Sequence, residues 1–133
     1  MKKSLFLLLG FLISVTMLAE EKNDTVINQL KYHFDGESSE WTLVDGTGVT
    51  IPKIDFVESS IEVDGISYDV TAIGENAFKN NKSINHVVIP DKIKVIEKNA
   101  FNGCSAIRLL EFPSSITDVN SSAFSGCSSI EFE

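Results

Sequence analysis

The feature that most constrains this chain is an internal repeat with a period of 23 residues. Three copies begin at Ile73, Ile96 and Val119 with "IGENAF", "IEKNAF" and "VNSSAF", and the third is shorter than the others. The first two copies share mainly apolar positions, which are Ile73/Ile96, Ala77/Ala100, Phe78/Phe101, Ile84/Ile107, Pro90/Pro113 and Ile93/Ile116. One repeat of this size cannot bury its own apolar face, so successive copies have to stack. The sequence therefore predicts a short solenoid of about two and a half repeats.

The apolar spacing within each copy predicts a strand and a return turn. An L-x-x-L-x-L spacing followed by proline indicates a short strand with its apolar side chains inward, which the proline ends. This inward set is Ile84, Val87 and Ile89 in the first copy and Ile107, Leu110 and Phe112 in the second. Apolar gaps of 3, 4 and 1 predict a helical or 3₁₀-like turn at Ile93, Ile96, Ala100 and Phe101. We therefore expect a mixed β-rich or α+β solenoid in which Phe78, Phe101 and Phe124 stack.

Three kinds of short segment carry a family resemblance. The "AF" segments, the "NGCSAI" and "SGCSSI" segments and the strand ends "VVIP" and "LEFP" resemble the BspA-type leucine-rich repeats, over about residues 49–133. The resemblance implies a leucine-rich repeat fold in a secreted or surface protein. It also implies attachment to host matrix proteins or to other cells, and no residue-level binding motif comes with it.

The N-terminal residues have the layout of a secretory signal peptide. Two lysines precede an apolar run from Leu5 to Leu18, and Ala19 stands before an acidic stretch. We expect residues 1–19 to be removed near Ala19, and an uncleaved signal anchor is the alternative. Any direct attachment to a membrane would then depend on this uncleaved segment.

The rest of the chain divides into three parts. We expect a polar tail and a small β-rich region at 20–48, a β-hairpin cap at 49–69 and the repeats at 70–133. The dipeptide Asp64-Gly65 predicts a type I′ turn between the two hairpin strands. Terminal elements of solenoids cover the end of the first repeat, which is the role we expect for this hairpin.

Length and charge exclude several classes of protein. The 133 residues suffice for one modest core, which excludes a multidomain enzyme. A formal net charge of -8 disfavours binding to nucleic acids, whose phosphates are also negative. Two cysteines and two histidines are too few for a disulfide scaffold or a zinc finger. We expect no cofactor and no metal site.

A search for catalytic groups finds one weak candidate. His33 and Asp35 would share a strand face, but acid–base catalysis also needs a pocket and a second group within reach. The sequence contains no nucleophile elbow, no phosphate loop and no zinc or calcium motif. We therefore expect no catalytic residue and no enzyme activity.

Two covalent features are left open by the sequence. Cys104 and Cys127 are one period apart and would lie on adjacent rungs, either as buried free thiols or as a disulfide. Sequons at Asn23, Asn81 and Asn120 would accept glycans in a eukaryotic secretory pathway.

The outward strand positions predict a protein-binding face. These positions are His86, Val88, Leu109, Glu111 and Phe132, and three of them are apolar. The favoured function is a secreted or surface-displayed, non-catalytic adhesion module that binds a protein, such as a host matrix or cell-surface protein. The alternative is a truncated or structural repeat unit that assembles with longer relatives and has no ligand of its own.

The end of the third copy predicts an open edge. Glu133 falls in the column of Val87 and Leu110, where an apolar residue is expected. We expect the last rung to fray or to self-associate through this C-terminal edge.

Overall fold

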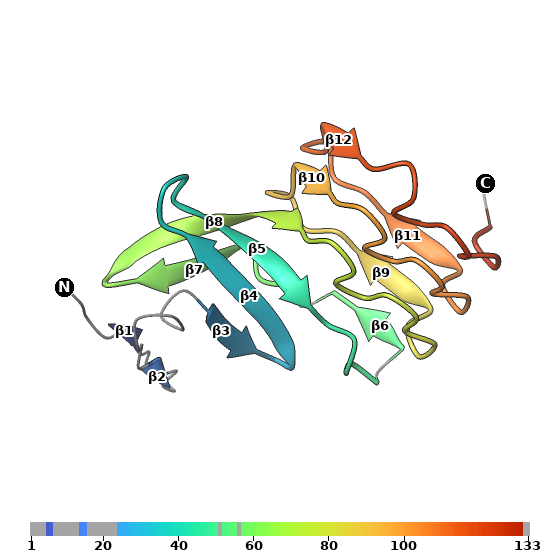
Figure 1. Ribbon diagram of the computed structural model, residues 1–133, viewed down its shortest axis with the longest axis horizontal. Helices are drawn as coiled ribbons and strands as arrows, with labels where there is room; N and C mark the ends of the chain where they lie inside the picture. Colours follow the sequence, from blue (N-terminus) through green and yellow to red (C-terminus); the bar gives the residue numbers. More distant parts are fainter. Residues whose placement is uncertain (1–4, 7–13, 16–23, 51, 56, 132–133) are drawn as a thin grey trace.

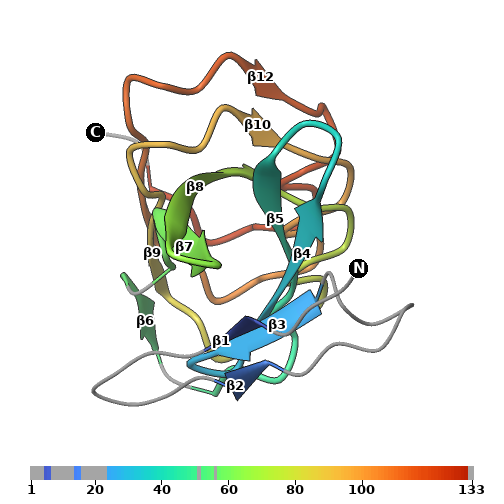
Figure 2. The same ribbon diagram turned by 90° about the vertical axis from the view of Figure 1, so that its left-hand side faces the viewer.

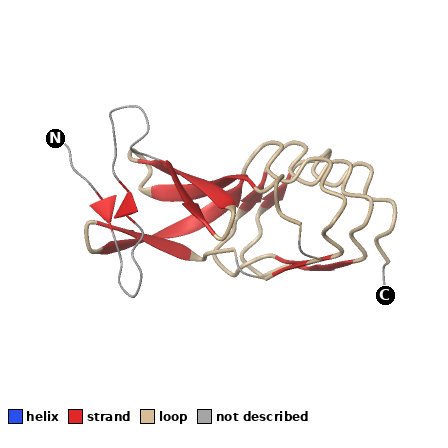
Figure 3. Cartoon of the chain, turned by 90° about the horizontal axis from the view of Figure 1, so that it is seen from below, coloured by secondary structure: helices blue, strands red, loops and turns tan. Residues whose placement is uncertain are grey.

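A computed structural model describes residues 5–6, 14–15, 24–50, 52–55 and 57–131 (Figure 1). The described residues form twelve strands and no helix (Figure 3). The strands are β1 Leu5–Phe6, β2 Ser14–Val15, β3 Asp24–Ile27, β4 Leu30–Asp35, β5 Glu40–Asp45, β6 Lys53–Ile54, β7 Ser60–Val63, β8 Ile66–Ile73, β9 His86–Val88, β10 Val95–Ile96, β11 Leu109–Glu111 and β12 Asp118–Val119. The expected signal peptide lies outside the described residues, apart from β1 and β2, which pair antiparallel. The fold is β-rich, and the α+β alternative is wrong for the part of the chain that the structure describes.

An antiparallel sheet of β3, β4 and β5 precedes the repeats and joins them through β8 (Figure 2). Apolar residues alternate along β4 and β5, so one face of this sheet is buried. Its buried side chains are Leu30, Tyr32, Trp41 and Leu43. The Tyr32 hydroxyl accepts a hydrogen bond from the Glu58 backbone N–H at 3.0 Å, which ties the loop before β7 to the sheet.

The hairpin of β7 and β8 forms with the turn that the sequence predicts. Asp64 and Gly65 have φ values of 50° and 83°, the left-handed conformations that a type I′ turn requires. The far half of β8 then pairs with β10 in parallel register, so β8 is itself the first repeat strand of its ladder.

Two parallel ladders build the repeats. In one ladder β8, β10 and β12 lie side by side, and in the other β6, β9 and β11 do. The rungs join through tight turns, in which Asn81 N–H donates to the Phe78 carbonyl at 3.0 Å and Cys104 N–H to that of Phe101 at 3.1 Å. Other turn amides bond to the next rung instead, as Phe78 N–H does to Ala100 O at 2.7 Å. The helical alternative is therefore wrong, because the amides that a helix would need are used between rungs. The 3₁₀-like alternative holds for the turn after Ile96 but not at Ile96 itself, which lies in strand β10.

The inward set is confirmed except at its end. Ile84, Val87, Ile89 and Ile107 are buried, and Leu110 is half-buried. Phe112, in contrast, is 50% exposed, so its prediction as a core residue is wrong. Its column neighbour Ile89 lies beneath a further rung, whereas no described rung covers Phe112.

Strands β5 and β6 add a rung before the first repeat. Thr42 pairs with Ala72 and Lys53 with His86, both in parallel register. The backbone N–H of Gly46 also donates to Ala77 O at 2.6 Å, where it continues the bonding between rungs. Strand β5 thus pairs with the outer edge of β8, and β6 pairs with that of β9. Strand β7 pairs with the first half of β8, from Ile66 to Asp69.

Candidate protein-binding face

The ladder of β6, β9 and β11 presents a flat outer face, which we call the repeat face. It is made of Lys53, His86, Val88, Leu109 and Glu111. Lys53, His86 and Leu109 are register partners and form one row across the three strands, while Val88 and Glu111 form a second row. Because Val87 and its partners Ile54 and Leu110 point inward, their neighbours on each strand point out. The structure thus brings four of the five predicted binding residues to one face, and Phe132 lies outside the described residues.

A hydrogen bond links the two rows of the repeat face. His86 Nε2 lies 2.6 Å from Glu111 Oε1, diagonally across β9 and β11. At the margins, Lys53 pairs with Asp55 at 3.0 Å and Arg108 with Glu131 at 3.3 Å. These marginal cations are paired with acids, so the face carries no large field of one sign.

Leu109 is the most exposed apolar side chain of the repeat face. It is 44% exposed, and Val88 is half-buried. Its row partner His86 is held by Glu111, so the apolar surface is bordered by fixed polar groups. Exposed apolar surface next to polar groups is typical of protein-binding surfaces.

Charge is distributed unevenly along the chain. Residues 24–70 hold two basic and ten acidic side chains, a difference of −8, whereas residues 71–131 hold six of each. Lysines of the repeats reach back to acids of the N-terminal sheet: Lys92 Nζ is 3.0 Å from Asp69 Oδ1, and Lys94 Nζ is 3.4 Å from Glu40 Oε1. The repeats are therefore neutral, and the N-terminal sheet is strongly acidic.

The histidine and aspartate of the weak catalytic candidate do not meet. His33 Nδ1 is 2.7 Å from Asp24 Oδ1, and Lys31 Nζ is 2.9 Å from Asp24 Oδ2. Partial burial would raise the pKa of Asp24, but the hydrogen bonds from Lys31 and His33 outweigh it and hold that pKa below its usual value. Asp35 instead accepts hydrogen bonds from Glu37 N–H and Ser38 Oγ within its own turn. The contacts of Asp24 on β3 with Lys31 and His33 on β4 hold these two strands together.

Two further features, a metal-binding cluster and a membrane-spanning helix, are absent from the described residues. Among the residues that the structure describes, no group of three or more His, Cys, Asp or Glu side chains could hold a metal ion. Within the same residues, no helix is long and apolar enough to span a membrane.

The two cysteines are free thiols in the structure. Cys104 Sγ donates to Phe78 O at 2.9 Å and Cys127 Sγ to Phe101 O at 3.1 Å, each one rung back. Burial raises the pKa of Cys104 to about 11 and also raises that of Cys127. Cys104 is thus a buried thiol and Cys127 a half-buried one, and both stay protonated at neutral pH.

Asn81 occupies the same column as the cysteines and is the structural residue that sequence reasoning missed. It is 5% exposed, and its Nδ2 donates to Val49 O at 2.7 Å. Its Oδ1 accepts from the N–H groups of Ser83 and Ile84, at 2.9 and 3.1 Å. The nitrogen that would carry a glycan is thus buried and bonded, so glycosylation of Asn81 is incompatible with this fold. Asn120 is exposed, and Asn23 lies outside the described residues.

Parallel ladders stacked at a 23-residue period, with tight turns between them, define a leucine-rich repeat solenoid. Residues 46–132 match the family model described as "BspA type Leucine rich repeat region (6 copies)". The chain belongs to this family of BspA-type leucine-rich repeat proteins.

Solved structures of bacterial repeat proteins share the fold. A leucine-rich repeat protein of Bacteroides capillosus is 23% identical with a TM-score of 0.70, and the match covers 82% of this chain and 79% of that one. The leucine-rich repeat protein of T. pallidum is 21% identical with a TM-score of 0.68, covering 80% and 47%. A leucine-rich cell surface protein of Faecalibacterium prausnitzii is 23% identical with a TM-score of 0.66, covering 80% and 29%. The chain thus spans under half the length of the last two, and no curated protein matches it.

Proposed function

We propose that this protein is a secreted or surface-displayed module that binds another protein through the repeat face. The observation that carries the proposal is the exposed Leu109 on β11, the outer strand of the ladder, beside His86, which Glu111 holds. A leucine on such a surface contributes to binding when a partner covers it, because its burial removes apolar area from water. Paired charges at the border then fix the register of the partner.

The chemical class of partner follows from the neutrality of the repeat face. Its charges are paired, so the face selects a partner with an apolar contact surface and not one of high charge. The family resemblance points to adhesion to a host matrix or cell-surface protein. We propose a binding role without catalysis, since the face offers no activated nucleophile.

Export rests on the N-terminal segment. The two lysines, the apolar run from Leu5 to Leu18 and Ala19 support secretion with cleavage near Ala19. Expression of the full chain, followed by mass measurement of the external protein, tests this proposal. A mass that still includes residues 1–19 would favour the uncleaved anchor.

The test of the binding role uses immobilised matrix and cell-surface proteins with the full chain as analyte. Leu109→Lys should abolish retention of any protein that the wild type binds, while Asp118→Lys, an exposed position on the other ladder, should retain it. Both variants should melt like the wild type, because exposed strand positions cost little to alter. Equal loss in both variants, or no effect of Leu109→Lys, would contradict the proposed face.

A structural role is the second candidate, and the exposure of the last described rung favours it. Phe112 and Val119 are 50% and 39% exposed, although their column neighbours Ile89 and Ile96 are buried. This flank offers apolar surface and a strand edge on which a further repeat of a longer relative would stack. Appending a full repeat should then raise the melting temperature, and sedimentation should show self-association of the unmodified chain that the added repeat removes. A monomer at high concentration would contradict self-association through this flank.

A further inference from the structure

The hairpin of β7 and β8 carries an apolar face that the core covers only in part. Val63 is paired with Ile66 and Ile61 with Tyr68, so these side chains lie on one face of the hairpin. Ile61 is buried against the N-terminal sheet, Val63 and Tyr68 are half-buried, and Ile66 is 55% exposed. Burial thus decreases toward the turn, where the hairpin projects from the end of the molecule (Figure 1).

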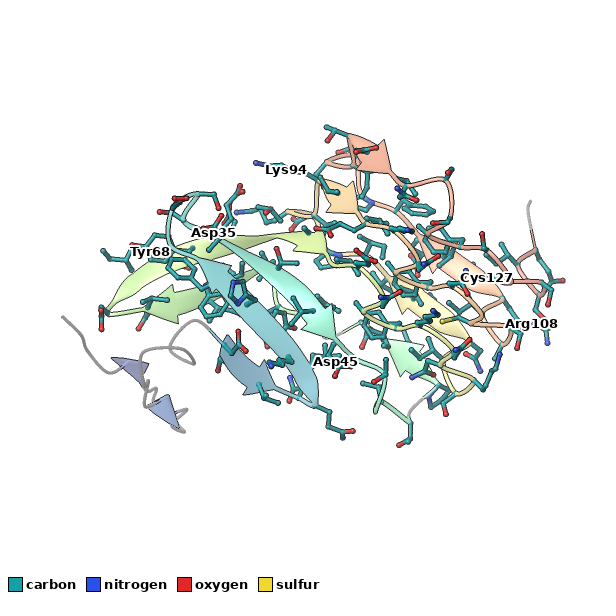
Figure 4. The ribbon with its side chains drawn as sticks, viewed as in Figure 1. Asp35, Asp45, Tyr68, Lys94, Arg108 and Cys127 are labelled. Carbon is teal, nitrogen blue, oxygen red and sulfur yellow. The ribbon has the colours of Figure 1, made fainter. Side chains whose placement is uncertain are left out.

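Aromatic rings continue this apolar surface onto β4. The Phe34 ring centroid lies 5.1 Å from that of Tyr68 and 5.0 Å from that of Trp41. Trp41 is fully buried and supports Phe34 from below, while Phe34 and Tyr68 remain half-buried. We call Phe34, Val63, Ile66 and Tyr68 the aromatic tip. Its Tyr68 lies at the same end of the molecule as Asp35 of the β4–β5 turn (Figure 4).

The aromatic tip belongs to the acidic part of the molecule. Of the acids in residues 24–70, Asp69 and Glu40 are paired with lysines of the repeats. Asp35 and Glu37 of the β4–β5 turn are exposed, and within the described ranges neither of them forms an ion pair. The charge at this end is therefore unneutralised, unlike that of the repeat face.

We propose that the aromatic tip docks a cationic segment of a partner protein, one that bears lysine or arginine next to an apolar residue. A cation over the faces of Phe34 and Tyr68 is attracted by the ring quadrupoles. Its aliphatic stem would pack on Ile66 while its charge faces the carboxylates of the β4–β5 turn. Rings and carboxylates thus select the same ligand chemistry. This second surface has a chemistry different from that of the repeat face, and it does not depend on the function proposed for that face.

The experiment measures binding of two labelled peptides to the full chain by fluorescence anisotropy. One peptide alternates lysine and leucine, and its counterpart replaces every lysine with glutamate. The lysine peptide should bind and the glutamate peptide should not. Tyr68→Ser and Ile66→Ser should each weaken binding by about tenfold, the loss expected for a contact worth ~1.4 kcal/mol. Ile66 is largely exposed, so the second variant keeps the test valid if Tyr68→Ser unfolds.

Matched charge variants separate a site from general attraction to an acidic protein. Glu37→Gln, in the β4–β5 turn, should weaken binding of the lysine peptide several-fold, whereas Glu75→Gln, an exposed acid of the repeats, should not change it. Leu109→Lys on the repeat face should also leave it unchanged, which keeps this test distinct from the function proposed above. Equal effects of Glu37→Gln and Glu75→Gln, or wild-type binding by Ile66→Ser, would overturn the proposal. So would a homodimer that Ile66→Ser dissociates, because the tip would then be covered by a second copy.

Discussion

The ring of Phe101 lies parallel to the ring of Phe124, with centroids 5.1 Å apart and an interplanar angle of 3°. Phe78 stacks on the other side of Phe101 at 5.0 Å and 8°. The three rings are one repeat period apart in the sequence, so the ladder that the repeat predicts is confirmed. Phe101 is covered on both sides and buried, whereas Phe124 has a described neighbour ring of the ladder on one side and is half-buried.

Removing the central ring should cost more than removing the outer one. Phe101→Ala should lower the free energy of unfolding by about 3–5 kcal/mol, since it deletes a fully buried aromatic side chain and leaves a cavity. Phe124→Ala should cost less, because water already reaches part of that ring. Urea unfolding of both variants checks this order. Equal losses, or a loss below ~1 kcal/mol at Phe101, would contradict a buried ladder.

Gly103 should not tolerate a side chain. Its φ is +77°, and a Cβ built there would meet Asn80 Oδ1, so Gly103→Ala strains the backbone and displaces Asn80. We expect a loss of roughly 1–3 kcal/mol of stability. Gly36→Ala is the matched control, because a Cβ there has no neighbour within 4 Å, and its melting temperature should stay near that of the wild type. A neutral Gly103→Ala would show that the rungs are not packed this closely.

Asn81→Ala should destabilise the junction between the first repeat and the rung before it. The change leaves Val49 O and the N–H groups of Ser83 and Ile84 without their partner in a buried place. We expect a loss of about 1–3 kcal/mol, measured by thermal or urea unfolding. Asn120→Ala, at an exposed position, is the control and should cost less. If both variants unfold alike, Asn81 does not hold the junction.

The buried thiols predict slow alkylation and a pH dependence of stability. The raised pKa of Cys104 favours the neutral thiol in the fold, so the stability it contributes is complete below pH 9.0 and is lost as pH rises toward about 11. Iodoacetamide at neutral pH should label Cys127 before Cys104, and unfolding should make both rates equal. Cys104→Ala should lose less stability than the wild type between these pH values. Rapid native labelling of Cys104 would contradict its burial.

Much of the repeat fold could be predicted because its signal is periodic. Ile84, Val87 and Ile89 recur with proline at fixed offsets, and that spacing alone places them inward. The hairpin turn could also be predicted, because Asp64-Gly65 between two β-prone runs strongly favours a type I′ turn. The residues of the repeat face could be predicted from the inward set, because side chains alternate between the two sides of a strand.

The parts that could not be predicted lack that period. Leu43 pairs with Ile73 at a separation of 30 residues, and Ile54 pairs with Val87 at a separation of 33. Neither separation equals the 23-residue period, so the sequence does not predict that β5 and β6 form a rung. The sequence identified Asn81 only as a candidate glycosylation site, because its hydrogen bond to Val49 O depends on that additional rung. Phe112 fits the apolar pattern, but the pattern does not say whether a further rung covers a residue. No described rung covers Phe112, and its side chain is therefore exposed.

The central claim is that a partner protein covers the repeat face, and methyl NMR of the full chain with a captured partner tests it most directly. The methyl signals of Val88 and Leu109 should shift or broaden on binding, while those of Val26, which is exposed on β3, should stay in place. Leu109→Lys should remove the response of Val88 without changing the spectrum of the free core. Unchanged Val88 and Leu109 signals in a complex that does form would place the contact elsewhere and contradict the account.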